Sequence, residues 1–296
     1  MKHAEWMADP ALCAAAEAIR NSGWSDSDCA RQVALVEDAP ISQQPLVEFQ
    51  RRMEDSGIVL ETQTFERVLL LHAAAIAAPR IETLPVHPQV KALLAEDFAG
   101  FARLRPNDPP VLGTYQFSTA CKLATLRRFP AGPLDWESSS LPRSWVLKAG
   151  PAGPRLLWFT LTRLGGFGPV FFMHAARRPR NRGLVIETEV MRAYFRMAQS
   201  LAQQREFKGF VAAAWFHDPA AVRDNPHLAA LNAPYLQHGG YITRIGSANL
   251  DSGFAEHNLE RRRKFEAGEL SYGIHVAIWP RRAALEWAGR HPELGR

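Results

Sequence analysis

The stretch that decides the fold is VFFMHAARRPRNRGLVIETEV, which spans residues 170–190. Its first four residues are continuously apolar, as in a buried strand. A basic loop follows, with four arginines in the six residues from Arg177 to Arg182. From Leu184 to Arg205, apolar residues recur at steps of three and four, which predicts a long amphipathic helix. The apolar face of that helix is formed by Ile186, Val190, Tyr194, Met197 and Leu201. The stretch therefore predicts a strand, a cationic loop and a helix in succession.

The cationic loop has three properties of an anion site. Backbone N–H groups at a helix N-terminus point outward unpaired, and the helix dipole favours negative charge there. Arginine adds bidentate donors for phosphate oxygens, and glycine lets the main chain approach a ligand. The residues predicted to bind a pyrophosphate are Arg177, Arg178, Arg180, Asn181, Arg182, Gly183 and Leu184. A solvated basic loop is the alternative.

The flanking sequence extends this unit on both sides. Downstream, the predicted elements are a buried strand Phe210–Phe216, a helix Pro226–Gln237, and strands Tyr241–Ile245 and Tyr272–Ile278. Upstream, Ala131–Pro142 is rich in Gly, Pro and Ser and is predicted to be a loop. Strands are predicted at Trp145–Lys148, Leu156–Thr162 and Val170–Met173, with a turn at Gly165–Gly168. We expect an α+β fold of the broad α/β class, with a mixed, mostly antiparallel central sheet.

Residues 1–130 are predicted to form a helical N-terminal region ahead of a domain at 131–296. The expected helices are Ala11–Ile19, Cys29–Val36, Gln44–Asp55, Thr64–Ala78, Val90–Leu104 and Tyr115–Arg128. Residues 1–110 hold 10 Lys+Arg and 16 Asp+Glu, whereas the remaining residues hold 25 and 14. The resulting net charges of −6 and +11 make the C-terminal part the expected place for an anionic partner.

Composition, cysteine count and missing motifs argue against a disulfide-linked protein, a membrane-spanning protein and several common enzyme families. The 296 residues are 47% hydrophobic and 22% charged, as in a soluble globular protein. The three cysteines, Cys13, Cys29 and Cys121, form no CxxC pair, which indicates reduced thiols and a cytoplasmic setting. The longest apolar stretch, Val68–Ala78, is too short to span a bilayer and predicts a buried helix. No signal-peptide h-region, P-loop, HExxH or GxSxG motif is present, and no metal is expected.

Two motifs resemble those of the GNAT (GCN5-related N-acyltransferase) superfamily. The loop Arg180-Asn181-Arg182-Gly183-Leu184-Val185 resembles the family's Arg/Gln-x-x-Gly-x-Gly/Ala, with Val185 where a small residue is usual. The segment Tyr235–Tyr241 resembles its Tyr-x-x-x-Gly-aromatic ending, with one extra glycine. The resemblance covers roughly residues 144–280.

The resemblance implies transfer of an acyl group from an acyl-CoA or acyl-carrier-protein thioester to an amine, by direct attack. It implies that the donor's amide-rich arm pairs with the strand Val170–His174, so that Met173 and Ala175 contact the donor. The pyrophosphate would bind at Arg180 to Leu184. Tyr235 would protonate the leaving thiolate, which departs more easily when an acid is near.

Other polar residues are weighed against structural roles. His174 is the candidate base, because histidine titrates near neutral pH; the alternative is a structural histidine. Glu187 is a second catalytic candidate, although with Glu189 it also suits the helix dipole. Asn225 and Asn232 are candidate donor ligands, and Asn225 also suits a helix cap. His217-Asp218 lies where ligands of open sheets bind, but Asp218 capping the next helix is the favoured interpretation.

Other functions remain open. The same fold suits a non-catalytic binding or regulatory module, or an acyltransferase acting on an RNA-linked substrate such as aminoacyl-tRNA. The basic run Arg261–Lys264 invites a nucleic-acid interpretation. Because glutamates surround it, an exposed helix with internal salt bridges is favoured instead. An unrelated α+β enzyme is the third alternative.

Overall fold

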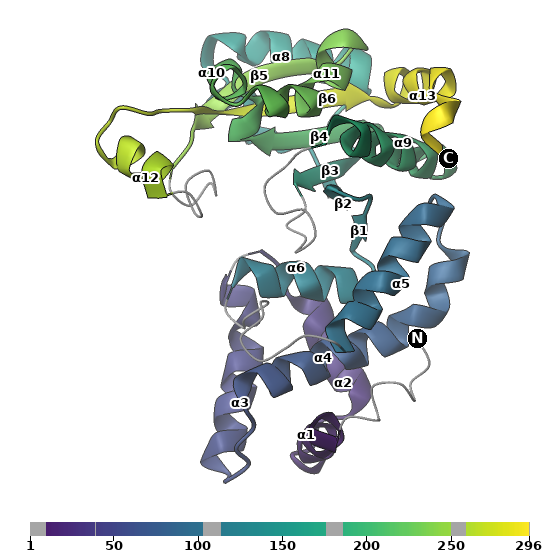
Figure 1. Ribbon diagram of the computed structural model, residues 1–296, viewed down its shortest axis with the longest axis vertical. Coiled ribbons are helices and arrows are strands. Elements are labelled where there is room, and N and C mark those ends of the chain that lie inside the picture. Colours follow the sequence, from purple (N-terminus) through teal and green to yellow (C-terminus); the bar gives the residue numbers. More distant parts are fainter. Residues whose placement is uncertain (1–9, 39, 103–113, 176–185, 250–258, 296) are drawn as a thin grey trace. The chain divides into compact units, whose positions relative to one another are not determined.

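The computed structural model describes residues 10–38, 40–102, 114–175, 186–249 and 259–295. The chain forms two compact units (Figure 1). Unit 1 comprises Met1–Leu84 and Pro88–Phe129, and unit 2 comprises Pro85–His87 and Pro130–Arg296.

Unit 1 is helical. Its α-helices are α1 (Pro10–Asn21), α2 (Asp26–Leu35), α3 (Gln44–Asp55), α4 (Thr62–Ala77), α5 (Pro88–Ala102) and α6 (Tyr115–Ala124). Helix α4 is the centre of this unit, because it packs against α1, α2, α5 and α6. Val68 to Leu71 and His72 are buried within it, which confirms the predicted buried helix. Among the described residues, no helix combines the length and the apolar character that crossing a bilayer requires.

The chain contains a six-stranded sheet in the order β1-β2-β3-β4-β6-β5, and strands β2 to β6 lie wholly in unit 2. The strands are β1 (Arg128–Pro130), β2 (Leu134–Ser140), β3 (Pro169–Ala175), β4 (Gly209–Ala214), β5 (Tyr241–Ser247) and β6 (Gly273–Pro280). The pairs β2–β3, β4–β6 and β5–β6 are antiparallel, and β3–β4 is parallel. The predicted mixed, mostly antiparallel α+β architecture is therefore confirmed.

Two of the predicted strands are wrong. Trp145–Lys148 lies in the helix α7 (Ser144–Lys148), and Leu156–Thr162 lies in α8 (Gly153–Phe159) and its π-helical continuation η5 (Thr160–Leu164). The buried side chains are Leu156, Phe159, Thr160 and Leu164. These follow helical steps of three and four, so the apparent alternation of Leu157, Phe159 and Leu161 was not a strand signal. The missing strand, β2, occupies the segment predicted to be a loop.

Helices cover both faces of the sheet (Figure 1). Helices α9 (Glu187–Gln203), α11 (Ala229–Gln237) and α13 (Arg281–Arg290) lie on one face, and α7 and α8 on the other. Short helices α10 (Pro219–Asp224) and α12 (Leu259–Glu266) flank them. Alternate residues of a strand face opposite sides. Accordingly, Val170, Val211 and Ile278 belong to the core beneath α8. On the α9 side, the Phe210 ring contacts the rings of Phe171 and Trp279.

The long helix α9 agrees with its predicted apolar face. Val190, Tyr194, Met197 and Leu201 are completely buried. Ile186 is exposed instead, because it is the N-cap residue and precedes the first helical turn.

Candidate functional site

The parallel strands β3 and β4 separate part-way along their length. They pair at Phe171–Phe210 and Phe172–Val211. Beyond this point β3 continues to pair with β2 as far as Ala175, and β4 continues with β6 as far as Ala214. Each strand therefore keeps its outer neighbour while losing the inner one. Backbone groups on such diverging edges are able to pair with an inserted amide-bearing ligand.

Tyr235 reaches this point of divergence from the helix α11. Its side chain is completely buried, and its hydroxyl lies 3.4 Å from the Sδ atom of Met173. Met173 is the first residue of β3 beyond the last pair with β4. The ring packs against Tyr194, with centroids 6.0 Å apart, and against Trp279, with centroids 5.8 Å apart. These contacts fix the hydroxyl where the two strands begin to separate.

Burial keeps the Tyr235 hydroxyl protonated. It raises the pKa of Tyr235 well above its ordinary value, and the neighbouring Tyr194 raises it further. The pKa of Tyr194 is also raised by burial, and its hydroxyl donates to the Leu231 carbonyl at 2.8 Å. Tyr235 is thus protonated at neutral pH, which is the form that can donate a proton.

A buried histidine–asparagine pair lies next to Tyr235. His217 Nδ1 is 2.5 Å from Asn232 Oδ1, and the rings of His217 and Tyr235 are 5.8 Å apart, centroid to centroid. The Asn232 amide nitrogen donates to the carbonyls of Phe216 and Leu228. This network assigns Nδ1–H of His217 as the donor to Asn232 Oδ1. Nε2 therefore carries the lone pair, and within the described part of the chain it is buried without a hydrogen-bond partner.

His217 is uncharged at neutral pH. Burial lowers the pKa of its imidazole to about 4, although the bond to Asn232 opposes that shift. The predicted role of Asp218 is confirmed, because its carboxylate accepts from Ala220 N and caps α10. The other carboxylate oxygen accepts from Gly273 N and lies 3.8 Å from His275 Nδ1. The pair His217–Asn232 was missed from the sequence, where only a histidine after a buried strand signalled it.

His174 lies on the opposite face of β3 from Met173. Its Nε2 atom is 3.2 Å from Glu137 Oε1, and both side chains are 15% exposed. Its ring also packs on Phe172. His174 and Tyr235 are therefore held on different faces of the sheet, beside the same strand divergence.

The remaining predicted residues are dispersed. Glu187 is exposed in the first turn of α9, and Glu189 in the same turn forms an ion pair with Arg192. Ala175 is exposed at the end of β3. Asn225 caps α10 and accepts from Arg261 at 3.0 Å. Asn232 is buried, and its amide is engaged with His217 and two carbonyls.

The predicted pyrophosphate loop lies outside the described residues. This applies to Arg177, Arg178, Arg180, Asn181, Arg182, Gly183 and Leu184. Their role stays a prediction from the sequence.

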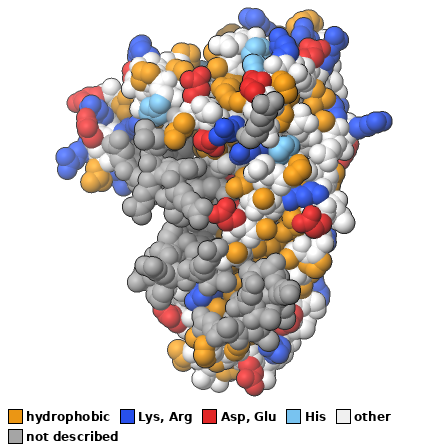
Figure 2. All heavy atoms as spheres, turned by 45° about the vertical axis from the view of Figure 1, so that its right-hand side comes forward, with side chains coloured by type: hydrophobic (Ala, Val, Ile, Leu, Met, Phe, Trp, Pro, Cys, Tyr) orange, Lys and Arg blue, Asp and Glu red, His pale blue; other side chains and the backbone are white. Residues whose placement is uncertain are grey.

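The second basic cluster belongs to α12 and is paired internally, as predicted. Arg262 pairs with Glu266 at 3.0 Å, and Lys264 pairs with Glu260 at 2.8 Å. Arg261 stacks over the Trp215 ring, 5.1 Å from its centroid. Basic and acidic side chains are interleaved on the left-hand projection in Figure 2, where α12 lies in Figure 1.

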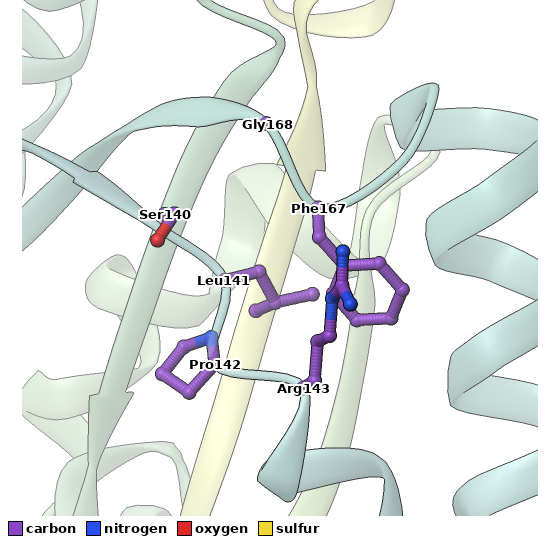
Figure 3. A pocket seen from close by; sticks show the side chains of 6 residues that line it. All are labelled: Ser140, Leu141, Pro142, Arg143, Phe167 and Gly168. Atoms are coloured by element: carbon purple, nitrogen blue, oxygen red, sulfur yellow. The ribbon is translucent and has the colours of Figure 1, made fainter.

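Two concave sites are lined by described residues, and neither includes Tyr235 or His217. One, of about 420 Å³, is lined by Ser140, Leu141, Pro142, Arg143, Phe167 and Gly168 (Figure 3). The other, of about 620 Å³, is formed by residues of η4 (Gly150–Ala152), α8, α11 and β5. The first lies beside the beginning of β3, at the other end of the strand from Met173. Within the described ranges, no group of three or more His, Cys, Asp or Glu side chains is arranged to hold a metal ion.

Comparisons with known proteins add little. No family model matches the chain, and no curated protein matches it. A solved structure of an acyltransferase in complex with decanoyl-CoA is similar over 88% of this chain and 82% of its own, with a TM-score of 0.40 and 12% identity. A likeness of that size carries no argument about the activity of the chain.

Proposed function

We propose that the protein is an acyltransferase that moves an acyl group from an acyl-CoA or acyl-carrier-protein thioester to an amine. The observation that carries the proposal is the buried, protonated hydroxyl of Tyr235 at the point where β3 and β4 diverge. The resemblance of the loop ahead of α9 and of the segment Tyr235–Tyr241 to GNAT motifs supports the same activity.

The reaction follows from charge movement at this point. The amine nitrogen attacks the thioester carbonyl carbon, and the C–S bond breaks. The sulfur leaves as a thiolate with the electron pair and takes the proton of the Tyr235 hydroxyl. The attacking amine loses its proton to His174, or to a water that His174 orients, and Glu137 holds that ring. His174 then releases that proton to solvent, and Tyr235 takes up a proton once the products have left, which restores both groups.

The donor would bind in two parts. The free edges of β3 and β4 supply backbone groups for the amides of the donor arm. The arginines ahead of α9 supply cations for its phosphates. Glu187 is exposed in the first turn of α9. Its simplest role is a favourable interaction with the helix dipole.

Thermal-shift titrations with acetyl-CoA, a long-chain acyl-CoA, free CoA and an acylated carrier protein test donor binding. We expect stabilisation by at least one donor, because a ligand that binds the folded state alone raises the melting temperature. Replacing Arg180 and Arg182 with Ala should weaken that effect, whereas the matched charge loss Arg262→Ala with Arg263→Ala should not. Failure of every donor to stabilise the chain would overturn the proposal. Stabilisation without turnover would identify a non-catalytic binding module.

A further inference from the structure

The helices on the α8 side of the sheet present large apolar side chains to solvent. Leu147 is 83% exposed, Trp158 60% and Leu161 53%. Leu157 is also exposed, and residues 157, 158 and 161 share one side of the continuous helix formed by α8 and η5. The opposite side of this helix carries the buried core residues Leu156, Phe159 and Leu164. Both sides of the helix are therefore apolar, which neither folding nor solubility requires.

The same helices carry charge of one sign. Arg143, Lys148, Arg155 and Arg163 are all exposed. None of the four forms an ion pair with a carboxylate in the described part of the chain. Residues 138–168, which include these helices, contain these four Lys+Arg and not one Asp or Glu. Stacking of Arg155 over Tyr241 at 5.6 Å and of Arg143 over Phe167 at 5.8 Å holds two of these cations at the surface.

We propose that this surface, formed by Leu147, Leu157, Trp158 and Leu161 with the four flanking cations, binds an anionic lipid bilayer. The helix α8–η5 would lie along the membrane plane, with its leucines and indole among the acyl chains and its cations at the headgroups. Interfacial helices combine these features, namely Trp and Leu on one side with Arg and Lys beside them. Indole is favoured at the membrane interface because it joins an apolar body to a polar N–H.

The observations favour a bilayer over two other anionic partners. A protein partner would complement these cations with acidic groups, but leucine is under-represented among the residues that carry protein–protein binding energy, and three of the four apolar side chains of this surface are leucines. Nucleic acid uses cations and stacking rings, but exposed leucines have no counterpart on phosphates. A bilayer with acidic lipids offers negative charge and hydrocarbon together.

Vesicle co-sedimentation of the full chain tests this proposal. We expect the protein to sediment with vesicles of phosphatidylcholine and phosphatidylglycerol, and to bind vesicles of phosphatidylcholine alone at least tenfold more weakly. Trp158→Ala with Leu161→Ala, and separately Lys148→Ala with Arg163→Ala, should each reduce partitioning about tenfold. Because the replaced side chains are exposed, the circular dichroism spectra and melting temperatures of the variants should match those of the parent protein. These two measurements show that the variants fold.

Matched controls come from other surfaces. Ile41→Ala with Val59→Ala removes apolar side chains in unit 1 that are more exposed than Trp158 and Leu161. Arg31→Ala with Arg282→Ala removes the same charge as Lys148→Ala with Arg163→Ala. Both should partition like the parent. The proposal is overturned if the control variants lose as much vesicle partitioning as the patch variants, or if the parent protein does not bind acidic vesicles. It is also overturned by loss, in the patch variants alone, of binding to an acidic carrier protein or to RNA while vesicle binding persists.

Discussion

The hydroxyl of Tyr235 lies 3.4 Å from the sulfur of Met173, at the first position where β3 no longer pairs with β4. A thioether is a weak hydrogen-bond acceptor. The phenolic proton also has the Tyr194 hydroxyl oxygen as an acceptor, and the group is completely buried. A thiolate formed at this position would be a far better acceptor than either neutral group, so it would take the proton.

Tyr235→Phe separates catalysis from binding. The variant keeps the ring packing and loses the proton, so turnover should fall about 100- to 1,000-fold, as expected for a lost general acid. The KM for the donor should change little, and stability should fall only modestly, since the bonds lost are a weak one to the Met173 sulfur and one to the Tyr194 hydroxyl. Steady-state kinetics with the donor identified by thermal shift provides the measurement. Unchanged turnover would remove Tyr235 from the mechanism.

Tyr194→Phe is the matched control. It removes the hydroxyl that donates to the Leu231 carbonyl and is hydrogen-bonded to Tyr235, but it leaves the Tyr235 proton in place. The substitution should therefore cost about 1 kcal/mol of stability and lower turnover much less than Tyr235→Phe. Equal losses of turnover in the two variants would indicate general damage to the core.

Gly240→Ala should displace the end of α11. An added Cβ would lie 2.8 Å from the Tyr235 Cα and carbonyl oxygen, and 2.8 Å from the Ile278 carbonyl oxygen. All three are backbone atoms, so the strain cannot relax by a side-chain rotation. We expect a loss of about 1–3 kcal/mol in urea unfolding, as for overpacked sites, together with reduced turnover. Gly239→Asn is the control, because Gly239 has φ +75°, which Asn tolerates, and an added Cβ there would meet only the Ala283 Cβ at an ordinary contact distance of 3.6 Å. Similar losses in both variants would contradict this reading of Gly240.

The sequence correctly predicts the elements in which the buried residues recur with a single regular spacing, that of a helix or that of a strand. Helix α9 was predicted because its apolar steps match its buried face. Strand β2 was missed because only Leu134, Asp135 and Trp136 are buried in it, followed by a half-exposed run ending in three serines. The sequence predicts a strand where α8 lies because the outward side of this helix is also apolar. That error arose from the same exposed leucines and Trp158 that form the proposed lipid surface.

In the candidate site, too, the sequence predicts what depends on neighbouring residues and misses a contact between residues far apart in the chain. Tyr235 was identified through a local motif, because its helix end and glycine turn are adjacent in the chain. The contact between His217 and Asn232 spans fifteen residues and depends on α11 returning over the end of β4. No short sequence motif predicts such a contact. The Gly239–Gly240 pair, which looked like an extra residue, supplies one left-handed turn and one close backbone approach.

Acid should destabilise the fold through His217. Its pKa is about 4 in the folded protein, against about 6.5 when unfolded. Between these two pH values His217 is protonated in the unfolded chain and neutral in the folded chain. Stability is therefore fully present above pH 6.5 and falls toward pH 4, by at most about 3 kcal/mol. Urea unfolding at several pH values measures the slope. His217→Gln should reduce that slope, and an unchanged slope would assign the acid loss to other groups, such as His275 and His87, whose pKa values are also lowered by burial.

Asn232 should control both the stability and the protonation of His217. In Asn232→Ala the buried Nδ1–H loses its acceptor, which should cost about 1–3 kcal/mol. In Asn232→Asp the acceptor is kept but becomes a carboxylate, and an adjacent negative charge favours the imidazolium. The folded-state pKa of His217 should then rise toward its unfolded value, so that the pH slope flattens although the histidine is retained. Unfolding curves at pH 5 and pH 8 distinguish the variants, with Asn225→Ala, which loses a partly exposed bond to Arg261, as the control. An unaltered pH slope in Asn232→Asp would show that the amide does not set the charge state of His217.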